Sequence, residues 1–151
     1  MIEIDGAAGE GGGQVLCNAL ALSLITGEAF HITDIRGRRP KPGMMRQHVT
    51  ALEAACEIGS ATANGTAIGG RELTFRPGRV RAGDYHFAVG SAGSATLILQ
   101  TVLLPLALVT GSSRLVLEGG THNTMAPPFE FLRHTFLPLI NRMGPQVTAR
   151  L

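Results

Sequence analysis

The segment Gly9-Glu10-Gly11-Gly12-Gly13-Gln14 constrains the fold of this chain more than any other stretch. It lies between a short apolar segment, Ile2–Asp5, and a long apolar run over residues 15–25 that closes with Thr26-Gly27. An apolar run that ends at a glycine is typical of a helix. Glycine loses more freedom on folding than any other residue, so a run of glycines indicates a tight turn or a backbone that is closely approached. The pattern predicts a strand, a glycine loop and a helix.

Two interpretations of the glycine loop are open from the sequence. In one, free amides at the start of a helix bind phosphate, and the Glu10 carboxylate holds a divalent cation. In the other, the loop is only a tight turn. Gln14 stands where the dinucleotide fingerprint needs its third glycine, and the loop contains no Gly-Lys-Ser/Thr. The loop is therefore neither that fingerprint nor a P-loop.

Composition indicates one domain with an ordinary core. The chain has 151 residues, of which 44% are hydrophobic. Its net charge is only +2, and every cationic residue except Lys41 is an arginine. Arginine suits bidentate phosphate recognition, although a GC-rich genome gives the same bias.

The sequence carries no signal for secretion or for a membrane. Cys17 and Cys56 lie in apolar helical runs without zinc-site or disulfide spacing, which indicates a reduced, cytoplasmic protein. The first residues lack the pattern of a signal peptide. The most apolar segment, residues 95–110, contains Gln100 and Pro105 and is shorter than the roughly 20 residues that a bilayer needs. We expect a buried helix there and no membrane partner.

Local patterns predict the order of the elements. We expect a strand at 2–5, a helix at about 14–26, a strand at 29–35, a helix from 43 to about 58, and a hairpin of strands 61–63 and 73–75. Together these elements form one βαβαββ unit.

The second half of the chain repeats this pattern at an offset of 84 positions. The offset places Gly6 on Gly90, Gly9 on Gly93 and Thr26-Gly27 on Thr110-Gly111. It also predicts a strand at 114–119 and a helix at about 127–143. Agreement in turns as well as apolar positions favours an internal repeat. The predicted fold class is α/β (α+β): duplicated βαβαββ units, about 1–80 and about 84–151, with helices packed on mixed β-sheets.

The second unit is incomplete, because the chain ends just after a strand signal at 146–149. Its closing strand is missing. This predicts that residues 1–151 are part of a longer protein, or that a partner covers an open sheet edge. Self-association into a homo-oligomer through that edge is a hypothesis from geometry.

A basic loop follows the second predicted strand. Arg36, Arg38, Arg39, Lys41 and Arg46 fall close together with no acidic residue among them. Such a run is often only a solvated loop. Here prolines and glycines shape the loop and a helix follows it, which also fits a fixed anion site for a polyphosphate or a nucleic-acid end. The corresponding residues of the repeat, 119–128, are uncharged, which favours a single anion site.

In order and spacing, these motifs resemble those of the RNA 3'-terminal phosphate cyclases. The matching residues are Gly6, Gly9-Glu10-Gly11-Gly12-Gly13-Gln14, Arg36, Arg39-x-Lys41-Pro42-Gly43, Arg46-Gln47-His48, Gly90-Ser91-Ala92-Gly93-Ser94 with Gln100, and Gly119-Gly120-Thr121 with Ala126-Pro127-Pro128. The resemblance extends from end to end of the chain.

The resemblance implies a ligase that uses ATP and Mg²⁺ (or Mn²⁺) to convert an RNA 3'-phosphate end into a 2',3'-cyclic phosphate. In the family, a histidine is adenylated by ATP, AMP passes to the RNA 3'-phosphate, and the adjacent 2'-hydroxyl displaces it. The family's large domain consists of βαβαββ repeats and is similar in fold to the enolpyruvyl transferases. This chain would be its N-terminal part, without the inserted small domain and the C-terminal repeat.

The resemblance also implies roles for individual residues. Glu10 matches the metal-binding carboxylate, with Gln14 beside it as a cofactor-binding residue. Arg36, Arg39 and Gln47 match residues that contact phosphates or the RNA end. Gln100 matches a residue that contacts the nucleotide. We expect Gln100 to face the core, where an amide needs a partner.

Two departures from the family pattern affect function. Cys17 replaces the usual arginine and cannot supply a guanidinium. None of the five histidines matches the adenylated one, so we expect the chain alone to be inactive. A cyclase-like RNA-binding module that serves in ribosome assembly without catalysis is the alternative function, and an enolpyruvyl transferase relative is a weaker one.

Overall fold

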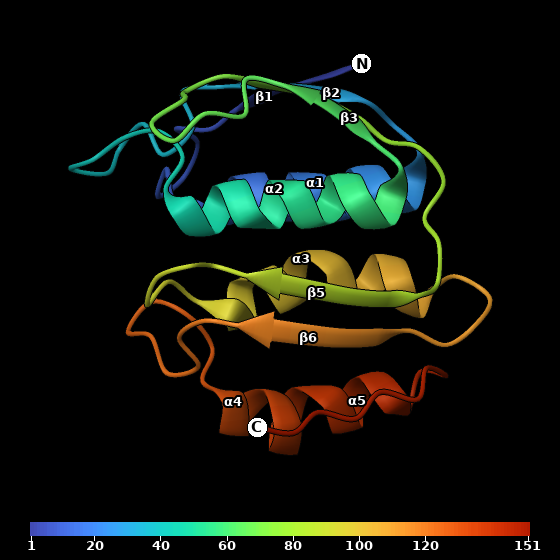
Figure 1. Ribbon diagram of the computed structural model, residues 1–151. Coiled ribbons are helices and arrows are strands. Elements are labelled where there is room, and N and C mark those ends of the chain that lie inside the picture. The colour runs from blue at the N-terminus through green and yellow to red at the C-terminus, as the bar shows by residue number, and fades with distance from the viewer.

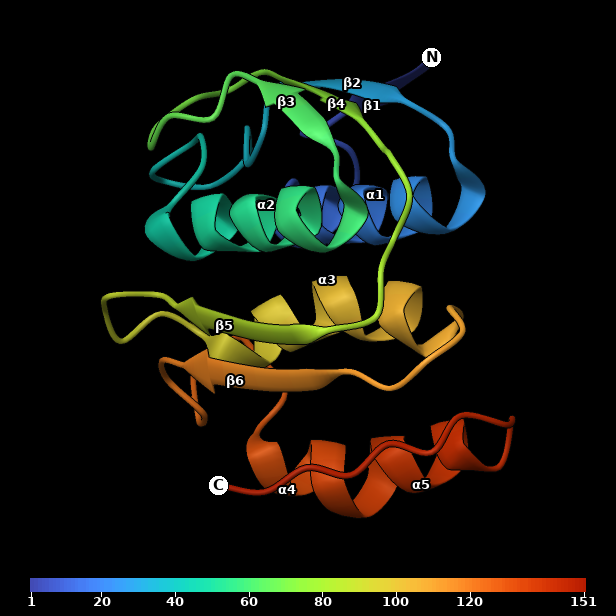
Figure 2. The ribbon, with the colours of Figure 1, turned by 45° about the vertical axis from the view of Figure 1, so that its right-hand side comes forward.

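The computed structural model describes residues 1–151. The first half of the chain forms a four-stranded sheet with two helices on one face (Figures 1 and 2). Its elements are β1 (Ile2–Asp5), α1 (Gln14–Thr26), β2 (Phe30–Thr33), α2 (Arg46–Gly59), β3 (Thr62–Asn64) and β4 (Leu73–Arg76). The strand order is β1-β2-β4-β3. β1 and β2 are parallel, whereas β4 is antiparallel to both β2 and β3. The sheet is therefore mixed, as the sequence predicts.

Along each strand, side chains alternate between the two faces of this sheet. Phe30 pairs with Phe75 across β2 and β4, and both are buried against the helices. Their ring centroids are 5.6 Å apart, within the range of favourable aromatic pairs. His31 follows Phe30 in β2 and faces the opposite side of the sheet, where its Nδ1 is 3.0 Å from the Thr74 hydroxyl.

The second half begins with two parallel strands, β5 (Asp84–Ala88) and β6 (Arg114–Glu118), joined through the helix α3 (Ala95–Ala107). α3 packs against α1 and α2 and shares their core, so the helices form the middle of the molecule (Figure 1). Each of the two strands has only one neighbour, so β5 is unpaired on its far side and β6 is unpaired at its outer edge. Self-association through that edge stays a prediction.

A last helical stretch runs without interruption over residues 129–141. It consists of α4 (Phe129–Phe131), the π-helical segment η1 (Leu132–Phe136) and α5 (Leu137–Asn141). In a π-helix, hydrogen bonds join residue i to i+5 and residues five apart come onto the same side. Leu132 and Leu137, five apart, are both buried.

The fold class is confirmed: the structure is α/β, with helices packed on mixed sheets. The duplication at an offset of 84 stays a prediction. The strand expected at 146–149 is wrong, because this segment forms no ladder. It runs back beside α5 (Figure 2), where the Asn141 side chain donates to the Val147 carbonyl at 2.9 Å and accepts from its amide at 2.8 Å.

None of the helices combines the length and the apolar character needed to cross a bilayer. The apolar segment around α3 is a buried helix, as expected from the sequence.

Candidate functional site

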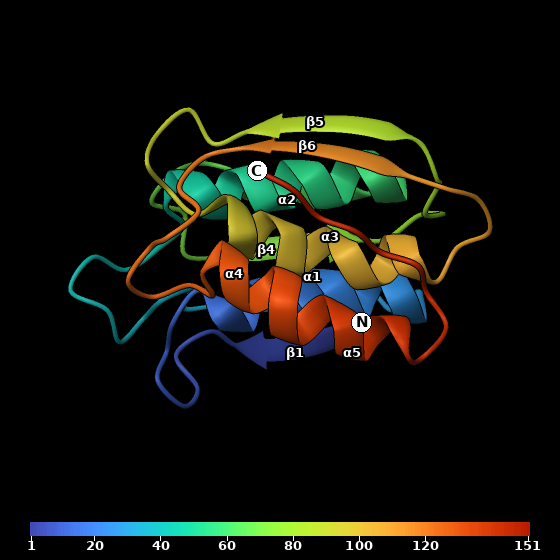
Figure 3. The same ribbon diagram turned by 90° about the horizontal axis from the view of Figure 1, so that it is seen from below.

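Three helices begin at the same end of the molecule. The residues before their first turns are Gly13 for α1, Met45 for α2 and Ser94 for α3. Figures 1 and 3 show these helix starts on the left, together with the loops that precede them. We call residues 6–13, 36–43 and 90–94 the loop cluster. Free backbone amides at helix starts attract anions. The Ser94 amide is bound by Gln47 and the Met45 amide by His48, whereas α1 has no side-chain cap, so the start of α1 is the one that favours a negatively charged ligand.

The glycines of the first loop make room for basic side chains. A Cβ on Gly11 would lie 2.8 Å from the Arg38 Cβ, and one on Gly12 would lie 2.8 Å from an Arg39 nitrogen. Gly9 and Gly11 also have positive φ values, +60° and +56°. From the sequence, the glycine loop could be either a ligand cradle or a tight turn. The structure adds a third reason for the glycines, namely close approach by the basic loop.

The basic loop touches the glycine loop directly. Arg38 donates to the Gly9 carbonyl at 2.9 Å, and Arg39 donates to the Glu10 carboxylate at 3.4 Å. The Glu10 side chain is 89% exposed, so this ion pair contributes little to stability. The pair nevertheless holds the Arg39 guanidinium and the Glu10 carboxylate together beside the start of α1.

Arg36 has a structural task besides the predicted phosphate contact. Its Nη1 donates to the carbonyls of Lys41 and Gly43, at 2.5 and 2.9 Å, and so closes the basic loop. Its φ of 55° is in the left-handed region, where a non-glycine residue is uncommon. Burial, and next the charge of Arg39, lower the pKa of Arg36. Any phosphate contact would use the remaining N–H groups.

Two neighbouring residues in the first turn of α2 contact the starts of the other two helices. Gln47 accepts from the Ser94 amide at 3.2 Å, at the start of α3. The ring of His48 lies against Gly13, at the start of α1. Its Nδ1 accepts from the Met45 amide at 3.0 Å, so Nε2 carries the proton of the neutral ring. Burial, and next the charge of Arg36, lower the pKa of His48 to about 4.

The two remaining predicted residues do not contact the basic loop. Gln14 is exposed in the first turn of α1, and its amide donates to the Asn18 side chain at 2.8 Å. Gln100 is exposed as well, which corrects the expected core-facing position. The buried face of α3 contains Ile98, Thr101 and Val102, and Gln100 points the other way. It lies on one face with the partly exposed Leu104, four residues later.

Cys17 belongs to the core and not to the loop surface. It is 2% exposed in the cluster formed by α1, α2 and α3, beside Thr101. Burial raises the pKa of its thiol, which disfavours the reactive thiolate form. An arginine at this position would have no space in this packing.

Glu10 is the only carboxylate that this site offers to a metal. No group of three or more His, Cys, Asp or Glu side chains gathers in the chain. Mg²⁺ commonly binds through one or two carboxylates together with substrate phosphates and waters. A single exposed carboxylate among helix-start amides fits that mode, and it does not fit a zinc or calcium cage.

None of the other histidines forms a hydrogen bond or ion pair with the glycine loop or the basic loop. His134 is exposed on η1. The remaining three are bound to nearby side chains: His31 to Thr74, His86 to Glu118, and His122 to both Thr121 and Glu130.

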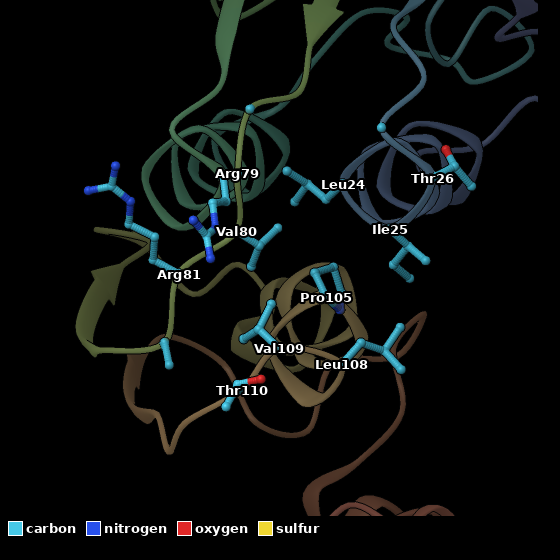
Figure 4. A pocket seen from close by; sticks show the side chains of 13 residues that line it. Leu24, Ile25, Thr26, Arg79, Val80, Arg81, Pro105, Leu108, Val109 and Thr110 are labelled. Atoms are coloured by element: carbon cyan, nitrogen blue, oxygen red, sulfur yellow. The ribbon is translucent and has the colours of Figure 1, made fainter.

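A cavity of about 810 Å³ lies at the opposite end of the helices (Figure 4). It is lined by the last turns of α1 and α3 and by residues 78–82. Its floor is apolar, with Leu24, Ile25 and Pro105, and the Arg81 side chain extends away from it (Figure 4). The C-terminal ends of the helices bring partial negative charge to this cavity, whereas Arg79 and Arg81 are cations among its lining residues.

Comparison with known proteins identifies the family. The family model described as RNA 3'-terminal phosphate cyclase matches residues 8–151. An RNA 3'-terminal phosphate cyclase of Koribacter versatilis (strain Ellin345) is 56% identical over 151 residues, which are 100% of this chain and 42% of the relative. One of Ectopseudomonas mendocina (strain ymp) is 53% identical over 150 residues, 99% of this chain and 43% of the relative.

The chain thus spans less than half the length of these curated relatives. Its glycine loop, basic loop and α2 start all lie within the matched residues. Matches that cover the whole chain at this identity establish the relationship: the chain belongs to the RNA 3'-terminal phosphate cyclase family.

Proposed function

We propose that this chain forms the phosphate-binding part of an ATP-dependent RNA 3'-terminal phosphate cyclase. One observation carries the proposal: Arg38 and Arg39 meet the glycine loop at the place where three helix starts converge. Cations and free amides on one surface suit an RNA end or the phosphates of a nucleotide. A cytoplasmic location belongs to the proposal, since both cysteines are free thiols.

Each residue has a specific task in this proposal. Glu10 would hold Mg²⁺ or Mn²⁺ against phosphate oxygens. Arg39, already beside Glu10, would neutralise the charge of the bound phosphate. Gln47 uses its oxygen to bind the Ser94 amide, so its NH₂ group is the part that remains for a ligand. Gln14 and Gln100 are proposed nucleotide contacts. When bound, ATP supplies the leaving group that activates the RNA 3'-phosphate.

The chain's own histidines would not form the adenylate. His48 is 4% exposed and has its Nδ1 committed to the Met45 amide. Incubation of the chain with α-labelled ATP and Mg²⁺, followed by denaturation, is expected to leave no acid-labile label on it. Retained label would show that one of these histidines, or another nucleophile, is adenylated after all.

The test of RNA-end binding compares a short single-stranded RNA ending in a 3'-phosphate with the same RNA ending in a 3'-hydroxyl. We expect the chain to prefer the phosphate, and Arg39→Ala to remove most of that preference. The salt slope of binding would fall by about 0.7 per lost phosphate contact on a single strand. Arg76→Ala is the matched control, because Arg76 is exposed in β4. Equal slopes for the two variants would sink the assignment.

The alternative is a cyclase-like RNA-binding module without catalysis. It is favoured by one observation, the burial of Cys17 at a position where the family usually has an arginine. The two functions differ in their nucleotide requirement. RNA-end binding that is unaffected by ATP and Mg²⁺, together with no measurable nucleotide binding, would favour the module.

A further inference from the structure

The fit between Gly13 and His48 is the closest contact in the loop cluster. A Cβ added to Gly13 would lie 2.0 Å from His48 Nε2 and within 3 Å of both neighbouring ring carbons. We propose that His48 is a positioning residue, whose ring holds the glycine loop at a fixed distance from the start of α2. The part of this inference that concerns ligands rests on the proposed function.

The ring is held from both sides, which makes it a fixed spacer. On the α2 side, Nδ1 accepts from the Met45 amide, one of the helix-start amides that would otherwise lack a partner. On the α1 side, the ring fills the space that only a glycine leaves free. With 4% exposure, the side chain has no solvent-facing alternative.

The neighbouring residue makes the corresponding contact with the third helix. Gln47 binds the Ser94 amide, and a Cβ on Gly93 would lie 3.0 Å from its Oε1. Two adjacent side chains of α2 therefore fit against two glycines, one before each of the other helices. The first turn of α2 sets the spacing of all three helix starts.

The position of Glu10 depends on this spacing. Glu10 precedes Gly13 by three residues, and the basic loop that carries Arg39 leads directly into α2. The other contacts between the loop that bears the carboxylate and the basic loop involve Ala7 and residues 9–12, so the His48 ring is the contact that fixes Gly13 at the start of α1. The relative placement of the two loops is what a phosphate with its metal ion would require.

Backbone geometry makes a clean steric test available. Gly13 has φ −67° and ψ −15°, an ordinary helical conformation, so Gly13→Ala introduces a methyl group without backbone strain. His48→Asn keeps an acceptor close to the position of Nδ1 but removes the atoms that face Gly13. The double variant G13A/H48N should therefore accept the methyl group that the single G13A variant cannot.

The experiment measures amide hydrogen exchange in residues 9–13 and binding of the 3'-phosphate RNA, for the 151-residue chain, for G13A, H48N and G13A/H48N, and for the controls G12A and G12A/H48N. We expect G13A to accelerate exchange and to weaken RNA binding by about 10-fold, and to add less than about 2-fold in the H48N background. Gly12→Ala is the control, because its Cβ meets the end of the Arg39 side chain and no atom of His48, so its effect should not depend on residue 48.

The results separate this inference from the proposed function. Equal effects of G13A in both backgrounds, or unchanged exchange in G13A, would overturn the positioning role. If the unmodified chain fails to bind the 3'-phosphate RNA, the proposed function is wrong. The exchange data alone then decide whether His48 positions the loop.

Discussion

Two strands of this molecule, β1 and β5, end in glycine-rich loops that lead straight into a helix. α1 begins at Gly13 without any side-chain cap. α3 begins at Ser94, whose hydroxyl accepts from the Leu97 amide at 3.2 Å and whose own amide binds Gln47. The start of α3 is thus satisfied by the protein itself, whereas the start of α1 keeps free amides next to Arg38 and Arg39. The same local fold serves packing in one junction and offers a ligand site in the other.

The two halves also differ in how completely they are packed. The first has a four-stranded sheet, and the second has two strands. A cavity of about 1310 Å³ lies between α3, β6 and residues 145–151. The half with the larger sheet is the one that carries the cationic loop, which matches the need of a binding site for rigid support.

The largest effect is expected from Glu10→Ala in a complete cyclase that contains this segment. The start of α3 has Ser94 at the position that the offset of 84 pairs with Glu10, and no carboxylate there can replace it. We expect metal-dependent adenylation to fall by roughly 1000-fold, because the ion would lose its protein ligand. Mg²⁺ titration of the adenylation rate measures this, with the exposed Glu3→Ala as control. Unchanged metal dependence would contradict the role of Glu10.

The second-largest effect is expected in the pH dependence of stability, which His48 would cause. Its pKa in the folded protein is about 4, below the ordinary 6.5, so the fold favours the neutral ring. The resulting stability is complete above pH 6.5 and is lost as the pH falls towards 4, by roughly 3 kcal/mol. Arg36 is the charged neighbour that contributes to this shift.

Denaturant unfolding of the chain at pH 7 and pH 4, compared with the H48N variant, checks this prediction. The loss of stability on acidification should be smaller in H48N, which has no titrating ring. An equal loss in both proteins would show that His48 is not buried in the neutral form.

Ser94→Ala tests the start of α3 by itself. Loss of the cap should lower the free energy of unfolding by about 1 kcal/mol. Binding of 3'-phosphate RNA should remain within a factor of about 2 of the unmodified chain, since the α3 start is occupied by Gln47. A large loss of binding at unchanged stability would mean that the second junction also takes part in the site.

The smallest effect is expected at the exposed pair of His86 and Glu118, whose side chains are 59% and 63% exposed. Glu118→Gln should change the free energy of unfolding by less than about 1 kcal/mol, because solvent screens such pairs. Thermal unfolding at neutral pH measures it. A larger loss would contradict the contrast between this histidine and the buried His48.

The sequence predicts the parts of this structure that local chemistry determines. The helix at residues 14–26 is correct at both ends, because an apolar run between Gly13 and Gly27 is bounded by clear local signals. The strand at 146–149 is wrong, because a strand needs a neighbour and this segment has none. The direction of Gln100 is wrong because α3 is apolar on almost every side, so its pattern does not say which face is buried.

In the candidate site, too, the residues of local motifs can be predicted from the sequence, whereas contacts that arise from packing cannot. Glu10 and Arg39 can be named from the sequence, and their contact is found in the structure. The fit of His48 against Gly13 joins residues 35 positions apart, and neither residue signals the other. A glycine followed far along the chain by a buried histidine is not a recognisable pattern, so this contact could come only from the packed structure.

The π-helical segment near the end of the chain implies an unusual response to deletion. In an ordinary helix, Leu132 and Leu137 would point in directions well over 90° apart, and one of them would leave the core. The wider turn in η1 corrects this phase difference. Removing one residue between the two leucines would therefore convert η1 to regular helix and leave Leu137 on its present face, because residues four apart lie on the same side of an α-helix. Both leucines would stay in the core, so this segment would tolerate a deletion that would rotate the later side chains of an ordinary helix out of register.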